Sequence, residues 1–264
     1  MNTKALTRVF EHAKFIDSLD FNGGIRFFTA LQGSQNYHLD DDESDIDTKS
    51  LIIPTINSVL FDKNHLSTTY EVPPTNEHAD VKDIRDMFDC FRKQNINFLE
   101  ILFTPYVDIE IPFINFYDEL FQRREEIAHY NPYQAVTTMY GHLLQKEKAF
   151  NHPCPSAQEK IDSLGYDPKQ LHHMLRIKDF LIKYVNNYSY EDCLIPDYPE
   201  DLIAIKRGSL SYEYADVLKE DTRKWADEFV QKWLPKMDNT PNQKLNLWMN
   251  YFVTNIFFAA QEVS

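Results

Sequence analysis

The chain has 264 residues, of which 43% are hydrophobic and 26% are charged, a composition typical of a globular protein with one large domain or two small ones. No apolar run reaches the length of a membrane span and the N-terminus lacks a signal-peptide pattern, so a cytoplasmic protein without a membrane partner is expected. The formal net charge of −14 argues against broad nucleic-acid binding, which depends on basic patches. Cys90, Cys154 and Cys193 are odd in number and far apart in the sequence, so we expect reduced thiols.

The first half of the chain alternates between helical and strand-like patterns. In chain order these patterns predict a helix over 4–18, a turn at 22–24, strands over 25–31 and 45–53, a loop at 73–74, a short strand at or beside Asp80, a helix over 84–91, and a helix end or buried strand over 98–103. Mixed elements of this kind predict a sheet flanked by helices.

After about residue 125 the pattern becomes helical. Asn131-Pro132 and Asp167-Pro168 are N-cap and first-turn pairs, and the second begins a helix that continues to Val185. Further helices are predicted over 214–229 and 245–256, with Trp248, Tyr251 and Phe252 in the core. The predicted fold is therefore α+β, with an N-terminal α/β domain over 1–125 and a C-terminal helical domain over 126–264.

Two carboxylates and a glycine–serine pair carry the chemistry of the first domain. Gly33-Ser34 follows the first predicted strand, and Asp45 and Asp47 begin the second. Side chains alternate along a strand, so both aspartates point the same way. Hard divalent ions take such oxygen ligands and bridge to phosphates, while glycine allows close approach of a backbone to a phosphate. The pattern indicates phosphoryl or nucleotidyl transfer.

A solvated acidic turn is the alternative for these aspartates, because residues 40–43 are also acidic. The Gly-Ser pair upstream and the apolar strand downstream favour metal binding instead. Residues 40–43 are expected to remain in a solvated loop. A strand-ending turn without ligand is the corresponding alternative for Gly33 and Ser34.

The motif Gly33-Ser34, a loop with Tyr37, then Ser44-Asp45-Ile46-Asp47 and an apolar strand resembles the signature of the DNA polymerase beta nucleotidyltransferase superfamily. Within it, the chain resembles a family of predicted nucleotidyltransferases from bacteria and their phages. A second block, from Asp80-Val81 to the segment 95–102, and a weaker third one, over 165–176, also resemble this family. The first two blocks cover roughly residues 25–105.

The resemblance implies a nucleotidyltransferase-type mixed sheet, Mg²⁺ or Mn²⁺ as cofactor, and ATP or another nucleoside triphosphate as substrate. It implies Asp45, Asp47 and Asp80 as metal ligands and catalytic residues, with Gly33 and Ser34 at the triphosphate. Glu71 and Glu77 are alternatives for the third carboxylate. Asp80 could instead cap the helix that starts near Lys82.

Other residues of the second block have structural alternatives. Asn95, Asn97 and Glu100 match the family, but a helix cap followed by a surface acid fits them equally well. Lys82 and Arg85 could contact a triphosphate, although a solvated helix face is the simpler interpretation.

In the helical half, Lys169, His173 and Arg176 lie at i, i+4 and i+7 and therefore share one helix face. One interpretation of this helix is structural. The other, which we take as the expected site, is that the three residues line a cleft and bind the nucleotide phosphates, with the nucleotide between the two domains, because ligand sites favour domain interfaces. Too few ligands surround His172 and His173 in sequence to predict a zinc site.

The predicted activity is transfer of a nucleoside monophosphate from an NTP to a hydroxyl or phosphate acceptor by a two-metal mechanism. The acceptor is a small molecule, an RNA or tRNA end, or a protein. Two alternatives share the fold: an enzyme that transfers AMP to a partner protein, and a non-catalytic nucleotide-binding or antitoxin-like protein. The complete Gly-Ser and Asp-x-Asp set favours an enzyme.

Overall fold

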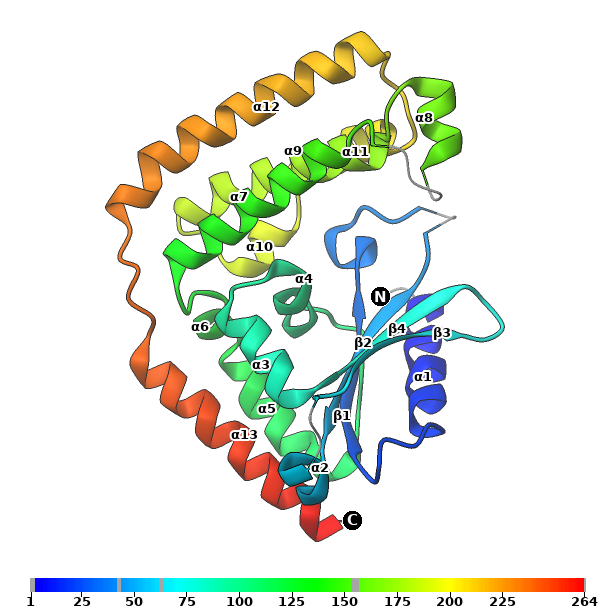
Figure 1. Ribbon diagram of the computed structural model, residues 1–264, viewed down its shortest axis with the longest axis vertical. Helices are drawn as coiled ribbons and strands as arrows, with labels where there is room; N and C mark the ends of the chain where they lie inside the picture. Colours follow the sequence, from blue (N-terminus) through cyan, green and yellow to red (C-terminus); the bar gives the residue numbers. More distant parts are fainter. Residues whose placement is uncertain (1–2, 42–43, 62–63, 153–156, 264) are drawn as a thin grey trace. The chain divides into compact units, whose positions relative to one another are not determined.

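The computed structural model describes residues 3–41, 44–61, 64–152 and 157–263. The chain divides into two compact units (Figure 1). Unit 1 comprises Met1–Asn36, Glu43–Tyr130 and Thr240–Ser264, and unit 2 comprises Tyr37–Asp42 and Asn131–Asn239. Unit 1 contains a mixed sheet flanked by helices and unit 2 is helical, which confirms the predicted α+β class.

The first part of unit 1 contains the sheet and most of the helices that cover it. Its elements are α1 (Thr3–Asp17), β1 (Ile25–Gln32), β2 (Asp47–Ile53), α2 (Ile56–Phe61), β3 (Ser67–Val72), β4 (Glu77–Asp83), α3 (Ile84–Arg92), α4 (Ile96–Leu99), β5 (Val107–Ile109), α5 (Ile114–Gln122) and α6 (Arg124–Ala128). Short 3₁₀ segments are η1 (Ser34–Tyr37), η2 (Glu100–Leu102) and η3 (Ile111–Phe113). The predicted first helix and first two strands are present, and 98–103 is helical.

The sheet has five strands in the order β3-β4-β2-β1-β5. β1 pairs with β2 and β5 in antiparallel fashion, β2 pairs with β4 in parallel, and β3 pairs with β4 in antiparallel fashion. Gln32 pairs with Asp47, and Lys49 pairs with Asp80. The end of β1, the beginning of β2 and the middle of β4 therefore lie together across the sheet.

Helix α1 covers one face of the sheet because its apolar residues recur at helical spacing. Val9, Ala13 and Ile16 are fully or almost fully buried. Ile16 packs against Ile52 of β2 and Val81 of β4. Thr48, the second residue of β2, also faces α1, because its hydroxyl contacts His12 of that helix. Side chains alternate along a strand, so Asp47 and Lys49 face the other side of the sheet.

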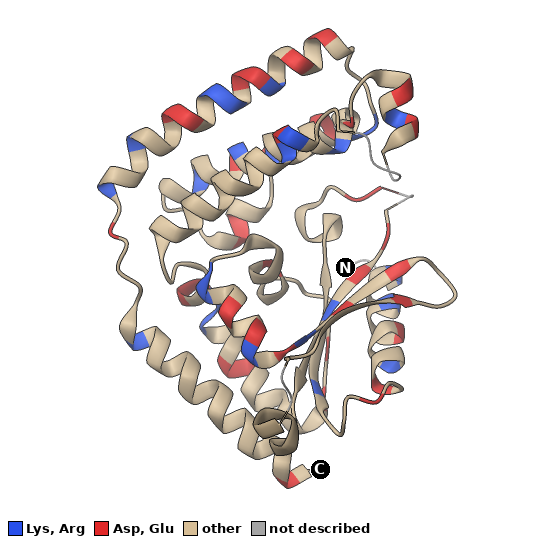
Figure 2. Cartoon of the chain, viewed as in Figure 1, with Lys and Arg blue, Asp and Glu red and all other residues tan. Residues whose placement is uncertain are grey.

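The other face of the sheet carries an aromatic core. Phe252 of α13 (Gln243–Val263) lies with its ring centroid 6.2 Å from that of Phe27, 5.3 Å from that of Phe88 and 5.8 Å from that of Phe116. Figure 2 shows few charged residues on α13, in keeping with this packing. Tyr251, expected in the core, is 66% exposed.

Helix α13 was expected in the C-terminal domain, but it belongs to unit 1. Residues 240–264 belong to unit 1 and residues 37–42 to unit 2. The sequence-based division used the change from mixed to helical patterns, which marks where helices begin. It contains no information about which core an apolar helix joins.

Unit 2 is built around α9 (Pro168–Val185). The other elements are α7 (Pro132–Ala149), α8 (Gln158–Leu164), α10 (Tyr190–Leu194), α11 (Pro199–Lys206), α12 (Tyr212–Trp233) and the 3₁₀ segment η4 (Leu234–Lys236). Asn131 and Asp167 cap α7 and α9 as predicted, each accepting a backbone N–H through its side chain. Acidic and basic residues alternate along α12 (Figure 2), which is typical of a helix with a solvated face.

Two of the three cysteines can be placed. Cys90 is partly buried, Cys193 is buried, and Cys154 lies outside the described residues. Burial raises the pKa of the Cys90 thiol, which keeps it in the unreactive protonated form. Within the described ranges, every helix is too short or too polar to cross a lipid bilayer.

Candidate active site

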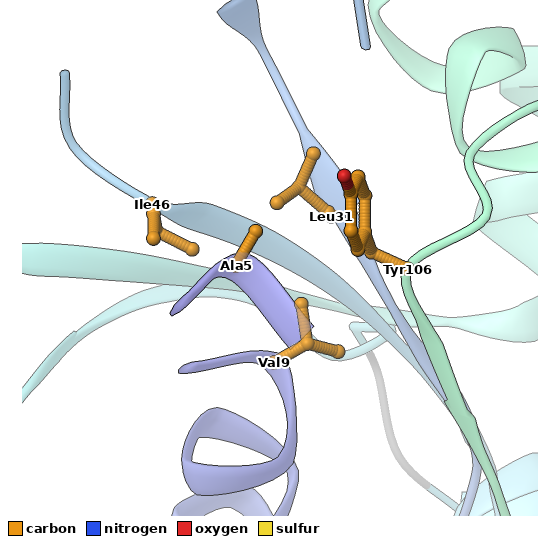
Figure 3. Packing of buried hydrophobic residues seen from close by; sticks show 5 residues of the cluster. All are labelled: Ala5, Val9, Leu31, Ile46 and Tyr106. Carbon is orange, nitrogen blue, oxygen red and sulfur yellow. The ribbon is translucent and has the colours of Figure 1, made fainter. Parts of the chain in front are cut away.

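Asp45 and Asp47 flank a residue that is buried directly before β2. Ile46 is 2% exposed. It belongs to a cluster with α1 and β1 (Figure 3), whose members are Ala5, Val9, Leu31, Ile46 and Tyr106. Because side chains alternate along an extended chain, both aspartates point away from this cluster. Asp45 is exposed and Asp47 is partly exposed.

Backbone contacts hold both aspartates in place. The His78 backbone N–H on β4 donates to Asp47 Oδ1 at 2.8 Å, and His78 Nδ1 lies 3.5 Å from the same oxygen. Gln35 Nε2 donates to the Asp45 carbonyl oxygen at 2.9 Å, which ties the loop after β1 to the start of β2. The Asp47 side chain nevertheless remains 37% exposed. Its carboxylate is therefore fixed in position and accessible to a ligand.

A buried polar network supports β2 from the α1 side. His12, fully buried, has Nδ1 2.9 Å from Thr48 Oγ1 and Nε2 3.3 Å from Glu77 Oε2. Arg8 Nε donates to the same Glu77 oxygen at 2.6 Å. Burial lowers the pKa of His12. Burial acts to raise the pKa of Glu77, but hydrogen bonds from Arg8, Thr75 and His12 offset it and lower the pKa overall. The network anchors the residue next to Asp47.

Asp80, expected as the third metal-binding carboxylate, forms an ion pair with Lys49. Lys49 Nζ lies 2.8 Å from Asp80 Oδ2, and the Lys49 side chain is only 5% exposed. The Phe98 ring covers the same ammonium group, with Nζ 4.2 Å from the ring centroid. A carboxylate that already balances a buried cation is a poor candidate for a metal ligand, because releasing it would leave the lysine unpaired. This geometry differs from the expected role of Asp80.

The structure also places the residues that bear on the alternatives to Asp80, namely a helix cap and another third carboxylate. The cap of α3 is Asp83, whose Oδ1 accepts the Arg85 N–H, so Asp80 is not a cap. Glu77 points to the α1 side in the network described above. Glu71 on β3 pairs with His78, shares the sheet face of Asp47 and is exposed. Among the alternatives, Glu71 is the acid on the same face as the aspartates.

The Gly33-Ser34 turn requires its glycine. Gly33 has φ +100°, and a Cβ there would meet no heavy atom within 4 Å. Its N–H donates to Glu100 Oε2 at 3.1 Å, and Asn36 Nδ2 lies 3.3 Å from the same oxygen. The space beside Gly33 is thus open to a ligand, while its own N–H is occupied. Among the residues that the structure describes, Ser34 Oγ makes only a long contact of 3.5 Å with Gln35 Oε1, so its hydroxyl can reorient toward a phosphate.

Glu100 is the residue of the second sequence block with the most specific role. It is 3% exposed and holds the turn through Gly33 and Asn36, so it is not a surface acid. Asn95 caps α4 by accepting the Asn97 N–H. The sequence pattern located these residues but could not distinguish a support of the turn from a ligand, because the partner lies 67 positions away along the chain.

Asp45 and Asp47 are the predicted metal ligands whose carboxylates remain accessible. No group of three His, Cys, Asp or Glu side chains suited to a metal occurs in the part of the chain that the structure describes. Two accessible carboxylates on one sheet face still fit Mg²⁺, which is commonly held by one or two carboxylates, water and substrate phosphates. The expected three-carboxylate site is not assembled, since Asp80 pairs with Lys49.

The other residues predicted to contact phosphates are Lys82 and Arg85 in unit 1 and three residues of α9 in unit 2. Lys82 Nζ donates to Ser67 Oγ at 2.6 Å, and Arg85 pairs with Asp83. Lys169, His173 and Arg176 lie on α9 in unit 2, with Lys169 exposed and Arg176 buried. Asp41 pairs with Lys206 and Arg207 at 3.7 and 3.6 Å within unit 2, so it is not a solvated loop residue. Residues 42–43 of that acidic run lie outside the described residues.

No family model and no curated protein matches the sequence. A solved structure of a nucleotidyltransferase-like protein from Exiguobacterium sibiricum 255-15 is similar over 86% of this chain and 74% of that chain, with 11% sequence identity and a TM-score of 0.34. The argument for function therefore rests on the residues of this chain.

Proposed function

We propose that the protein is a metal-dependent nucleotidyltransferase that moves a nucleoside monophosphate from an NTP to a hydroxyl or phosphate acceptor and releases pyrophosphate. The observation that carries this proposal is the pair Asp45 and Asp47, presented on one sheet face beside the glycine turn at Gly33. The buried network beneath β2 supports it, because a strand start fixed on one side presents its carboxylates on the other without rearrangement.

In this proposal each residue has a limited role. Asp45 and Asp47 would hold a divalent cation, which would neutralise charge at the phosphates and lower the pKa of the attacking hydroxyl. The open space at Gly33 admits the phosphates, and the Ser34 hydroxyl donates to them. The acceptor oxygen bonds to the α-phosphorus as the bond to the pyrophosphate oxygen breaks. Positioning and electrostatics account for the catalysis, as in other phosphoryl transfers.

Removal of divalent cations is expected to abolish pyrophosphate release. The two carboxylates repel one another and the substrate phosphates when no cation balances their charge. The measurement is pyrophosphate release from each NTP with Mg²⁺, with Mn²⁺ and with excess EDTA, in the presence of a cell extract as source of acceptor. Release that continues at the same rate in EDTA would contradict metal-dependent transfer.

A Cβ at Gly33 is expected to weaken NTP binding. Gly33→Ala places a methyl group in the open space beside the turn and strains the positive φ, at a cost of about 1–2 kcal/mol in stability. We expect the Kd for NTP to rise about tenfold. Gly23→Ala is the matched control, because Gly23 also has a positive φ, +78°, in unit 1. Unchanged affinity in Gly33→Ala, measured by calorimetry, would exclude this turn as the phosphate site.

A further inference from the structure

Basic side chains lie on α7 and on α9, which pack against one another within unit 2. Spacing places His142 and Lys146 on one face of α7, and Lys169, His173 and Arg176 on one face of α9. We call these five residues, His142, Lys146, Lys169, His173 and Arg176, the basic cluster. The sequence alone indicated only the three members on α9.

Arg176 is buried, and two of its nitrogen atoms have no hydrogen-bond partner within the described part of the chain. The residue is 7% exposed, and the two atoms without a partner among the described residues are Nε and Nη1. The guanidinium stacks on the Tyr37 ring, with Cζ 4.0 Å from the ring centroid. Such stacking stabilises the charge but satisfies no N–H donor. Leaving buried, charged donors unsatisfied is costly, so these donors point to a missing anion.

Burial and neighbouring positive charges disfavour further positive charge within the basic cluster. Burial, then the charges of Lys169 and Arg176, lower the pKa of Lys146. Burial, then Lys146 and Arg176, lower the pKa of His142. Burial, followed by Arg176 and other cations, holds the pKa of His173 well below its usual range. These electrostatic effects indicate that the five side chains lie near one another, with His142, Lys146 and His173 partly buried and Lys169 exposed.

Nearby carboxylates are engaged elsewhere. Asp167 raises the pKa of Lys146, but its oxygens accept the Lys169 backbone N–H at 3.0 Å and Gln170 Nε2 at 2.8 Å as the cap of α9. Within the described parts of the chain, Lys146, Lys169 and Arg176 form no ion pair. The charges of the basic cluster are thus not balanced by acidic side chains.

We propose that the basic cluster is a binding site for a phosphate-bearing anion, with Arg176, Lys146 and Lys169 as its ligands. A planar guanidinium with unsatisfied N–H groups suits paired phosphate oxygens, and two lysines supply further charge. A di- or polyanion balances several cations at once, which a single carboxylate does not. The phosphate belongs either to a nucleotide or to a phosphorylated acceptor. The site goes beyond the proposed transfer reaction, because it requires neither Asp45, Asp47 nor a metal ion.

The test is calorimetry on the full chain in EDTA, with pyrophosphate, ATP, a sugar phosphate monoester and adenosine as separate titrants. We expect pyrophosphate to bind and adenosine not to bind. Tighter binding of ATP and pyrophosphate than of the monoester would assign the site to the nucleotide, and the reverse order to the acceptor. Absence of binding for all three anions would overturn the proposal.

Variants separate the basic cluster from general electrostatic attraction. Lys146→Gln and Lys169→Gln should each weaken pyrophosphate binding about tenfold or more. Lys148→Gln is the matched control, since Lys148 is an exposed lysine on the same helix. Lys169 is exposed, so its variant tests the site even if Arg176→Gln fails to fold. Equal losses in Lys146→Gln and Lys148→Gln would contradict a defined site.

Two further measurements distinguish this site from the proposed active site and from a structural role. Asp47→Asn should keep pyrophosphate binding in EDTA, and loss of binding there would place the phosphate in unit 1 instead. Without anion, Lys146→Gln should raise the Tm because it relieves repulsion among partly buried cations. A purely structural lysine would give the opposite shift, and that result would also contradict the proposal.

Discussion

Asp45→Asn and Asp47→Asn are each expected to reduce nucleotidyl transfer by about a thousandfold or more while leaving the protein folded. Loss of a metal ligand removes several kcal/mol of transition-state stabilisation, and each 1.4 kcal/mol is about tenfold in rate. Stability should change little, because both side chains are accessible to solvent and point away from the Ile46 cluster.

Initial rates of transfer and thermal unfolding of the same preparations check this expectation. Asp118→Asn provides the matched control, since Asp118 is an exposed aspartate on α5 of the same unit. Near-normal transfer by either active-site variant in Mg²⁺ would rule out the proposed role of the carboxylate pair. A large loss of stability would instead show that the aspartates support the fold.

Asp80→Asn is expected to lower the free energy of unfolding by about 3 kcal/mol. Removing one partner of a buried ion pair leaves an uncompensated charge, and Lys49 has only 5% of its side chain exposed. Phe98 covers the ammonium group at 4.2 Å and limits its escape to water. The loss of stability should therefore exceed that of an ordinary surface substitution.

The double variant Lys49→Met/Asp80→Asn separates pairing from catalysis. Methionine fills a similar volume against Phe98 without a charge, so the double variant should recover most of the stability lost in Asp80→Asn. The double-mutant cycle is completed by measuring urea unfolding of the wild type, of Asp80→Asn, of Lys49→Met and of the double variant. If Asp80→Asn keeps wild-type stability but loses transfer, Asp80 is a catalytic carboxylate, as the family resemblance implies, and the ion-pair interpretation is wrong.

Local patterns in the sequence were sufficient to place the elements that carry the candidate site. The strand predicted over 25–31 is β1, the strand over 45–53 contains β2, and the helix start at Asp167-Pro168 is observed. These predictions succeed because side-chain alternation, helical spacing and capping residues act within a few positions of the chain.

Contacts between distant segments could not be predicted in the same way. The sequence places Lys49 two positions after Asp47, but only the parallel register of β2 and β4 brings it to Asp80. Likewise, Glu100 reaches Gly33 only through the packing of η2 beside β1. Register and packing depend on the whole core, so a single segment does not specify them.

The assignment of α13 shows the same limit on a larger scale. Its apolar face predicted a buried helix, and Phe252 is buried. The aromatic rings that it contacts, including Phe27 and Phe88, lie more than a hundred positions earlier in the chain. Amphipathic spacing predicts that a helix is buried but not the core into which it packs.

The most direct test of nucleotidyl transfer follows a radiolabel placed on either the α- or the γ-phosphate of each NTP. The protein is incubated with Mg²⁺ and cell extract, and labelled acceptors are separated from nucleotides. Our account predicts label on the acceptor from the α-labelled NTP only, release of pyrophosphate, and no transfer by Asp47→Asn. Transfer of the γ-label, or transfer of the α-label that persists in Asp45→Asn and Asp47→Asn, would contradict it.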